Sequence, residues 1–100
     1  MKKINQSELN KIIESNLYVL VYFFTKWCGP CKQLSPQLEE IEDLYKDVKF
    51  VKIDIEENTE LSQDFDITSV PTVTIIKDNE ILSLIAGPSI YDILQLLQKR

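Results

Sequence analysis

Apolar residues recur along this chain at two spacings, one typical of helices and one typical of strands. Four segments repeat every three or four residues, as in helices that bury one face: 5–15, 34–45, 58–65 and 90–97. Asn5 is followed three residues later by Glu8, which has the form of a capping box and predicts a helix start. Asn58 is a plausible cap for the short third helix.

Four other segments have the composition of strands, namely 18–24, 48–55, 72–76 and 80–86. The first is β-branched, aromatic and apolar on both faces, which predicts a central strand covered on both sides. Asp78 and Asn79 tolerate positive φ, so they can make a tight hairpin turn between the last two strands.

The order of these elements predicts an α/β fold. A strand–helix–strand unit implies a right-handed crossover and parallel pairing, whereas the hairpin at its end is antiparallel. We therefore expect a central mixed sheet with helices on both faces. The 100 residues suggest one domain over 1–100, and 44% hydrophobic residues can build its core.

Charge and hydropathy limit the partners. The net charge is -5 and the basic residues are scattered among acidic ones, which argues against a nucleic-acid partner. The longest apolar run, 18–24, is too short to span a bilayer, so we expect no membrane association. Two lysines near the start are not followed by the apolar stretch of a signal peptide, and we expect a cytoplasmic protein.

The chain has two cysteines and no histidine. The lack of histidine excludes Cys–His and Ser–His nucleophilic pairs. Two cysteines cannot close a tetrahedral Cys/His zinc site within one chain, so we expect no metal. A zinc ion shared between two chains is the alternative.

The two cysteines, Cys28 and Cys31, lie between a predicted buried strand and a predicted helix. A cysteine at a helix N-terminus meets free N–H groups and the helix dipole, which favour the thiolate that attacks disulfides. Pro30 suits the first helical turn, and Gly29 lets a partner approach the backbone closely.

The spacing of the cysteines favours redox catalysis. Once Cys28 has attacked a substrate disulfide, Cys31 is one turn away and can attack the mixed disulfide within the same molecule. A structural pair of cysteines is the alternative, but the position between strand and helix, with Trp27 beside it, favours catalysis.

The stretch FFTKWCGPCKQLSP resembles the active-site region of thioredoxins, and the resemblance extends over nearly the whole chain. It implies a thioredoxin fold with a four- to five-stranded sheet, in which residues 2–4 supply a short first strand. Pro36 matches the family's helix-bending proline. Pro71 matches a cis proline that faces the disulfide, and Gly87 matches the glycine that leaves room at the substrate groove.

The resemblance also implies a substrate-binding surface. Trp27, Val70 and Pro71 would form an apolar docking surface, with the backbone of Val70 ready to pair with an extended substrate. The alternatives are that Trp27 is a packed core aromatic and that Pro71 only opens a strand.

Tyr22 departs from the family pattern and leaves Lys52 without its expected partner. Tyr22 stands where thioredoxins carry a buried aspartate thought to help deprotonate the resolving cysteine, and a tyrosine with a pKa of about 10 is a poor proton acceptor. Lys52 matches the lysine that pairs with that aspartate. We expect Tyr22 to slow resolution by Cys31, and Lys52 to reach solvent or pair with another acid such as Glu56.

These observations predict a monomeric thiol–disulfide oxidoreductase that reduces protein disulfides. The resemblance implies thioredoxin reductase as electron donor, disulfide-containing proteins as substrates and no bound cofactor. An oxidase or isomerase is the alternative within the same chemistry. A binding module that uses the thioredoxin surface without catalysis is the alternative from another class.

Overall fold

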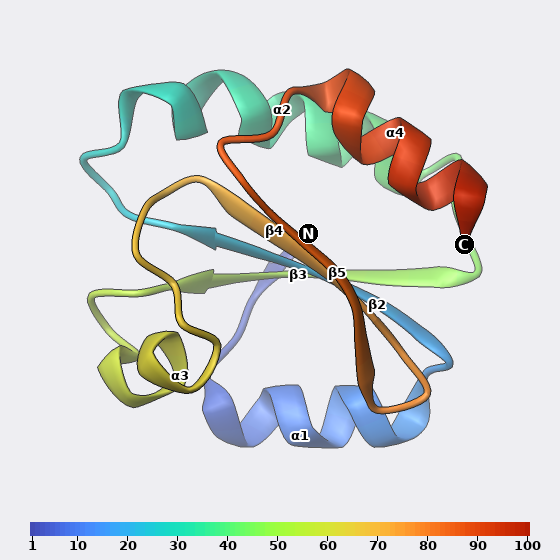
Figure 1. The fold of residues 1–100 in the computed structure, drawn as a ribbon, viewed down its shortest axis with the longest axis horizontal. Coiled ribbons are helices and arrows are strands. Elements are labelled where there is room, and N and C mark those ends of the chain that lie inside the picture. Colours follow the sequence, from blue (N-terminus) through green and yellow to red (C-terminus); the bar gives the residue numbers. More distant parts are fainter.

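Four helices and five strands make up the computed structural model, which describes residues 1–100 (Figure 1). In chain order they are β1 (Lys2–Lys3), α1 (Gln6–Ser15), β2 (Tyr18–Phe24), α2 (Gly29–Glu42), β3 (Val48–Asp54), α3 (Thr59–Asp64), β4 (Thr72–Lys77), β5 (Glu80–Ala86) and α4 (Ile90–Lys99). This is the predicted order, with a first strand of only two residues. None of the helices combines the length and apolar character needed to cross a lipid bilayer.

The five strands form one mixed sheet in the order β1-β3-β2-β4-β5. β3 pairs in parallel with β1 and β2, whereas β4 pairs antiparallel with β2 and β5. The predicted parallel pairing and the predicted antiparallel hairpin are therefore both confirmed. β2 is hydrogen-bonded on both edges, so the segment that leads into the cysteine motif is held from two sides.

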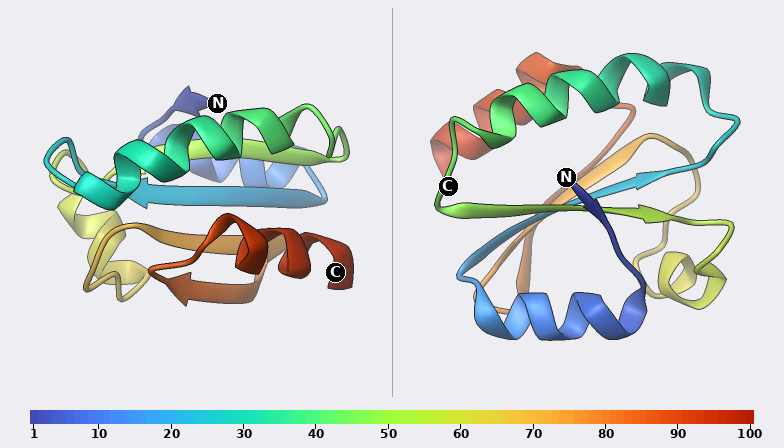
Figure 2. Two further views of the ribbon diagram at one scale, coloured as in Figure 1. Left: turned by 90° about the horizontal axis from the view of Figure 1, so that it is seen from above. Right: turned by 180° about the vertical axis from the view of Figure 1, so that it is seen from behind.

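Helices cover both faces of this sheet. α2 and α4 lie on one face, and α1 and α3 lie on the other (Figures 1 and 2). Alternate residues of β2 point to opposite faces, so that Leu20 and Tyr22 belong to one core and Val19, Val21 and Phe23 to the other. This alternation explains why an uninterrupted apolar run fits a central strand.

Local signals at the element ends behave mostly as expected. Asn5 and Glu8 form the predicted capping box. The turn residues Asp78 and Asn79 have φ of 50° and 68°, which the short polar side chains tolerate. Asn58 precedes α3, but its side chain makes no cap bond, and its amide N–H donates to the Asp54 carbonyl.

Candidate active site

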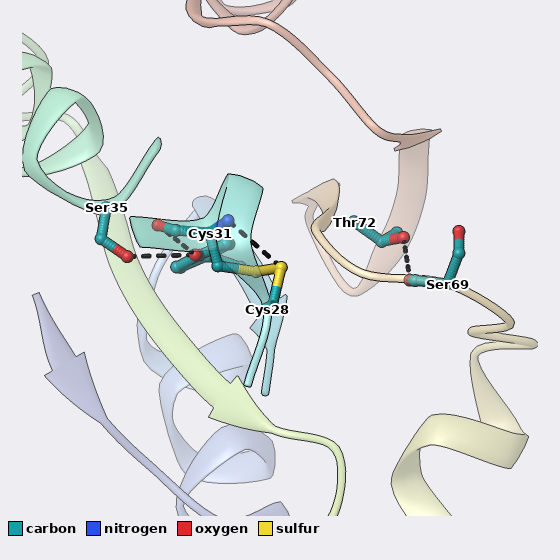
Figure 3. The surroundings of a disulfide bond; sticks show 6 residues. Cys28, Cys31, Ser35, Ser69 and Thr72 are labelled. Atoms are coloured by element: carbon teal, nitrogen blue, oxygen red, sulfur yellow. Dashed lines mark hydrogen bonds between the residues drawn. A yellow bond between two sulfur atoms is a disulfide. The ribbon is translucent and has the colours of Figure 1, made fainter. Parts of the chain in front are cut away.

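Cys28 and Cys31 form a disulfide at the start of α2, just beyond the end of β2 (Figure 3). Their Cα atoms are 5.2 Å apart. Cys28 is the N-cap of α2, and Pro30 lies in the first turn, where a helix does not need its missing N–H. The sequence Cys-Gly-Pro-Cys thus begins the helix and places both sulfur atoms at its N-terminal end.

The surroundings of the two sulfur atoms differ. The backbone N–H of Cys31 donates to Cys28 Sγ over 3.1 Å. Cys28 is 8% exposed, whereas Cys31 is 3% exposed. When the disulfide is reduced, the same N–H and the helix N-terminus favour a thiolate at Cys28. The more exposed of the two cysteines is therefore also the one suited to attack.

Tyr22 lies in β2, and its side chain is fully buried close to the disulfide. Its hydroxyl donates to the Cys31 carbonyl over 3.2 Å and accepts from Ser35 Oγ over 3.0 Å. Burial raises the pKa of Tyr22, so the phenol stays neutral where the family resemblance implied a carboxylate. Sequence reasoning missed Ser35, although it follows Cys31 by four residues and so shares its helix face.

Lys52 lies beside Tyr22, since the two residues are partners in the β2–β3 ladder. Of the two outcomes expected for Lys52, the pairing with an acid such as Glu56 is wrong, because Lys52 makes no ion pair in the structure. The other, access to solvent, is found in part. The Lys52 side chain is only half-buried, and Nζ lies 5.7 Å from the centre of the Phe24 ring. Contact with the ring face and partial access to solvent take the place of a carboxylate partner.

The loop before β4 lies across from the disulfide (Figure 3). The Val70–Pro71 peptide bond is cis, as the resemblance implied. Thr72 Oγ1 donates to the Ser69 carbonyl over 2.7 Å, and the N–H of Gly87 donates to the Pro71 carbonyl over 2.8 Å. The first bond closes the proline loop on itself, and the second ties it to the segment that follows β5.

The backbone conformation at position 87 favours glycine. The φ of Gly87 is +63°, a region that favours glycine. A Cβ atom added there would meet no protein atom within 4 Å, so the missing side chain leaves the neighbouring space open.

An open groove of about 440 Å³ runs between α2, the proline loop and the start of α4. Eleven residues line it: Pro30, Gln33, Leu34, Gln37, Val70, Pro71, Gly87, Pro88, Ser89, Ile90 and Tyr91. None of them is charged, although the chain carries 27% charged residues. The structure thus brings Pro30, Val70, Pro71 and Gly87 together.

Sequence reasoning overlooked part of this groove. Gln33, Gln37 and Tyr91 were not predicted, because only the packing of α2 beside α4 shows that they share a surface. Trp27 lies outside the lining, but it is 84% exposed, so the alternative of a packed core aromatic is wrong. The roles of the groove residues in binding stay predictions.

Three kinds of comparison point to one family. The thioredoxin family model matches residues 1–99. Thioredoxin 1 of Plasmodium falciparum is 36% identical over 95 residues, which cover 95% of this chain and 91% of that protein. A thioredoxin of Mycoplasmoides gallisepticum is 42% identical over 81 residues, covering 80% of this chain and 81% of that one.

Solved structures agree in fold. A structure of Plasmodium falciparum thioredoxin superposes with a TM-score of 0.94 at 35% identity, covering 99% of this chain and 98% of that one. Oxidised mitochondrial thioredoxin 3 of Saccharomyces cerevisiae superposes with a TM-score of 0.93 at 29% identity, covering 100% and 95%. With its cysteine pair at the N-terminus of α2, the chain belongs to the thioredoxin family of thiol–disulfide oxidoreductases.

Proposed function

We propose that the protein works as a reductant of protein disulfides. The Cys28 thiolate attacks a substrate disulfide, which forms a mixed disulfide and releases one substrate thiolate. Cys31 then attacks Cys28 Sγ, which releases the second substrate thiolate and forms the Cys28–Cys31 disulfide. Two electrons have passed to the substrate. The observation that carries this direction of attack is that Cys28, the more exposed of the two residues, accepts at Sγ from the Cys31 N–H.

The uncharged groove supports a role in holding the substrate chain beside Cys28. An extended segment would lie between α2 and the proline loop, against Val70, Pro71 and Gly87, with the exposed Trp27 next to Cys28 in the chain. Such a surface suits uncharged stretches next to a substrate disulfide, since a buried charge there would find no partner.

The oxidised protein must regain two electrons for each turnover. We assign this step to a thioredoxin reductase, without a cofactor bound to this chain, and we propose a monomer. We further propose the cytoplasm, because a reductant suits a compartment that keeps thiols reduced. Relatives also include mitochondrial and chloroplastic thioredoxins, so fractionation of the native cells has to test the location.

Replacing Cys31 with serine tests the two-step mechanism. Because the mixed disulfide can no longer be resolved from within, Cys31→Ser should accumulate substrates covalently bound through Cys28. Non-reducing gels followed by reduction would measure this. The matched control Cys28→Ser should trap none. Partners held equally by both variants, without a covalent bond, would instead indicate a non-catalytic binding module.

The reduction potential separates a reductant from an oxidase or isomerase. Equilibration with glutathione buffers should place the Cys28–Cys31 couple near the thioredoxin value of about -270 mV. A value near that of strong oxidants, about -120 mV, would contradict the proposal.

A further inference from the structure

Two hydroxyl groups form a chain of hydrogen bonds beside the disulfide. Ser35 Oγ donates to Tyr22 Oη over 3.0 Å, and Tyr22 Oη donates to the Cys31 carbonyl over 3.2 Å. In Figure 3 the Ser35 side chain points toward the backbone of Cys31 from the next turn of α2. Both hydroxyl protons are therefore used in hydrogen bonds, and this chain of hydrogen bonds ends on the carbonyl of the resolving cysteine.

The backbone of Cys31 is consequently held on two sides. Tyr22 binds its carbonyl from β2, while its N–H donates to Cys28 Sγ over 3.1 Å. Pro36 lies inside the same helix and removes the N–H that would bond to the carbonyl four residues earlier. The carbonyl freed by Pro36 is that of Lys32, so the anchor from the central strand lies one residue before the helix bond that is lost.

We propose that Ser35 and Tyr22 are a positioning pair that holds the Cys31 N–H on Cys28 Sγ and so stabilises the reduced form. A hydrogen bond to a thiolate is charge-assisted and stronger than one to a disulfide sulfur. Fixing the donor therefore favours the dithiol state over the disulfide. The inference concerns thiol–disulfide exchange itself, so it holds whether the protein serves as a reductant or an oxidant.

The charges around this pair indicate that it acts by geometry and not by accepting a proton. No carboxylate hydrogen-bonds to Tyr22, Ser35 or either cysteine. The charged residues on adjacent segments are Lys26 and Lys32 on either side of the cysteines, and Lys49, Lys52 and Asp54 in β3. β4 adds none before Lys77 at its far end. The lysines are cations, which cannot take a proton, and Asp54 accepts from the Glu56 N–H instead.

Two conservative substitutions test the pair. Ser35→Ala and Tyr22→Phe should each shift the equilibrium with glutathione at least threefold toward the disulfide, which is about 14 mV at 29.6 mV per tenfold. Each should also lower the fraction of Cys28 thiolate at neutral pH, measured by ultraviolet absorbance. The double variant should shift the equilibrium no further than a single one, because the two groups act as a unit.

Ser15→Ala is the matched control, since Ser15 donates to the Lys11 carbonyl on exposed α1, on the opposite face of the sheet. Shifts no larger than in this control, shifts toward the dithiol, or additive shifts would overturn the proposal. A purely structural role would also overturn it. In that case the substitutions would lower the free energy of unfolding, measured in urea, by the same amount in the oxidised and the reduced form. Ser35→Ala keeps β2 intact, so the test stands even if Tyr22→Phe fails to fold.

Discussion

Tyr22 determines what kind of proton chemistry is possible beside the disulfide. Cys31 must lose its proton before it can attack the mixed disulfide. The phenol cannot take that proton, because burial raises its pKa and its lone pair already accepts from Ser35. The Cys31 proton has to be accepted by water or by the departing substrate thiolate. Resolution should therefore be slower than with a carboxylate at this position.

Tyr22→Asp should increase insulin-disulfide reduction severalfold per folded molecule, because a carboxylate can act as general base for Cys31. Burial raises a carboxyl pKa, so this gain should be present at high pH and disappear as pH falls through that pKa. Losing the ring should lower the free energy of unfolding by about 3–5 kcal/mol. Tyr22→Asn is the control of matched shape. The rates are measured across pH from the turbidity of reduced insulin. Equal rates for Tyr22→Asp and Tyr22→Asn would contradict the idea.

At the scale of elements, short local motifs specify where helices and strands begin and turn. Both α1 and α4 start with a capping box, at Asn5 and at Ser89. The β4–β5 hairpin turns through two residues, both with positive φ. Two-residue hairpins favour glycine at the second turn position, where this chain has Asn79. The turn therefore has the geometry of a two-residue hairpin, but asparagine at position 79 is less favourable there than glycine.

Asn79→Gly should raise the free energy of unfolding by about 0.5 kcal/mol, because glycine adopts this φ without steric cost. Urea denaturation of the oxidised protein would measure the change. The same substitution at Asn10, inside α1, should lower stability by roughly 0.3 kcal/mol. A loss at both positions would show that the positive φ is not strained for asparagine.

At the scale of the whole molecule, ion pairs join segments that are far apart in sequence. Lys3 in β1 pairs with Glu57 over 3.0 Å, and Arg100 at the end of the chain pairs with Asp47. A hydrogen bond from Lys3 holds the pKa of Glu57 below its ordinary value, and one from Arg100 does the same for the pKa of Asp47. Both carboxylates are exposed, so salt should weaken these links.

Acid should therefore destabilise the fold in part through these pairs. A carboxylate with a lowered pKa stabilises the folded state above its unfolded pKa, about 4.5 for Glu57, and that contribution is lost as pH falls through the lowered value. Urea unfolding from neutral pH to pH 2 should show a smaller loss for Lys3→Gln than for the parent. Lys49→Gln, an exposed lysine without an ion pair, is the control. Identical profiles for all three proteins would rule the pairs out.

The sequence by itself determined the elements, their order and the cysteine motif, because these depend on periodicity and on neighbours within a few residues. It also pointed to Pro71 and Gly87 through resemblance. Only the tertiary structure decided which of these residues meet. The groove is lined by α2 and by residues 70–71 and 87–91, and no local sequence pattern shows that these distant segments lie close together.

The edges and partners of elements were equally a matter of packing. β5 is as apolar as an inner strand, yet it lies at the sheet edge with Ile81, Leu82 and Leu84 about half exposed. Lys52 and Ser35 found their contacts across strand and helix, where charge and spacing alone suggested other partners or none. The cysteine motif was thus readable from the chain, whereas the hydroxyl pair behind it exists only once β2 and α2 are packed together.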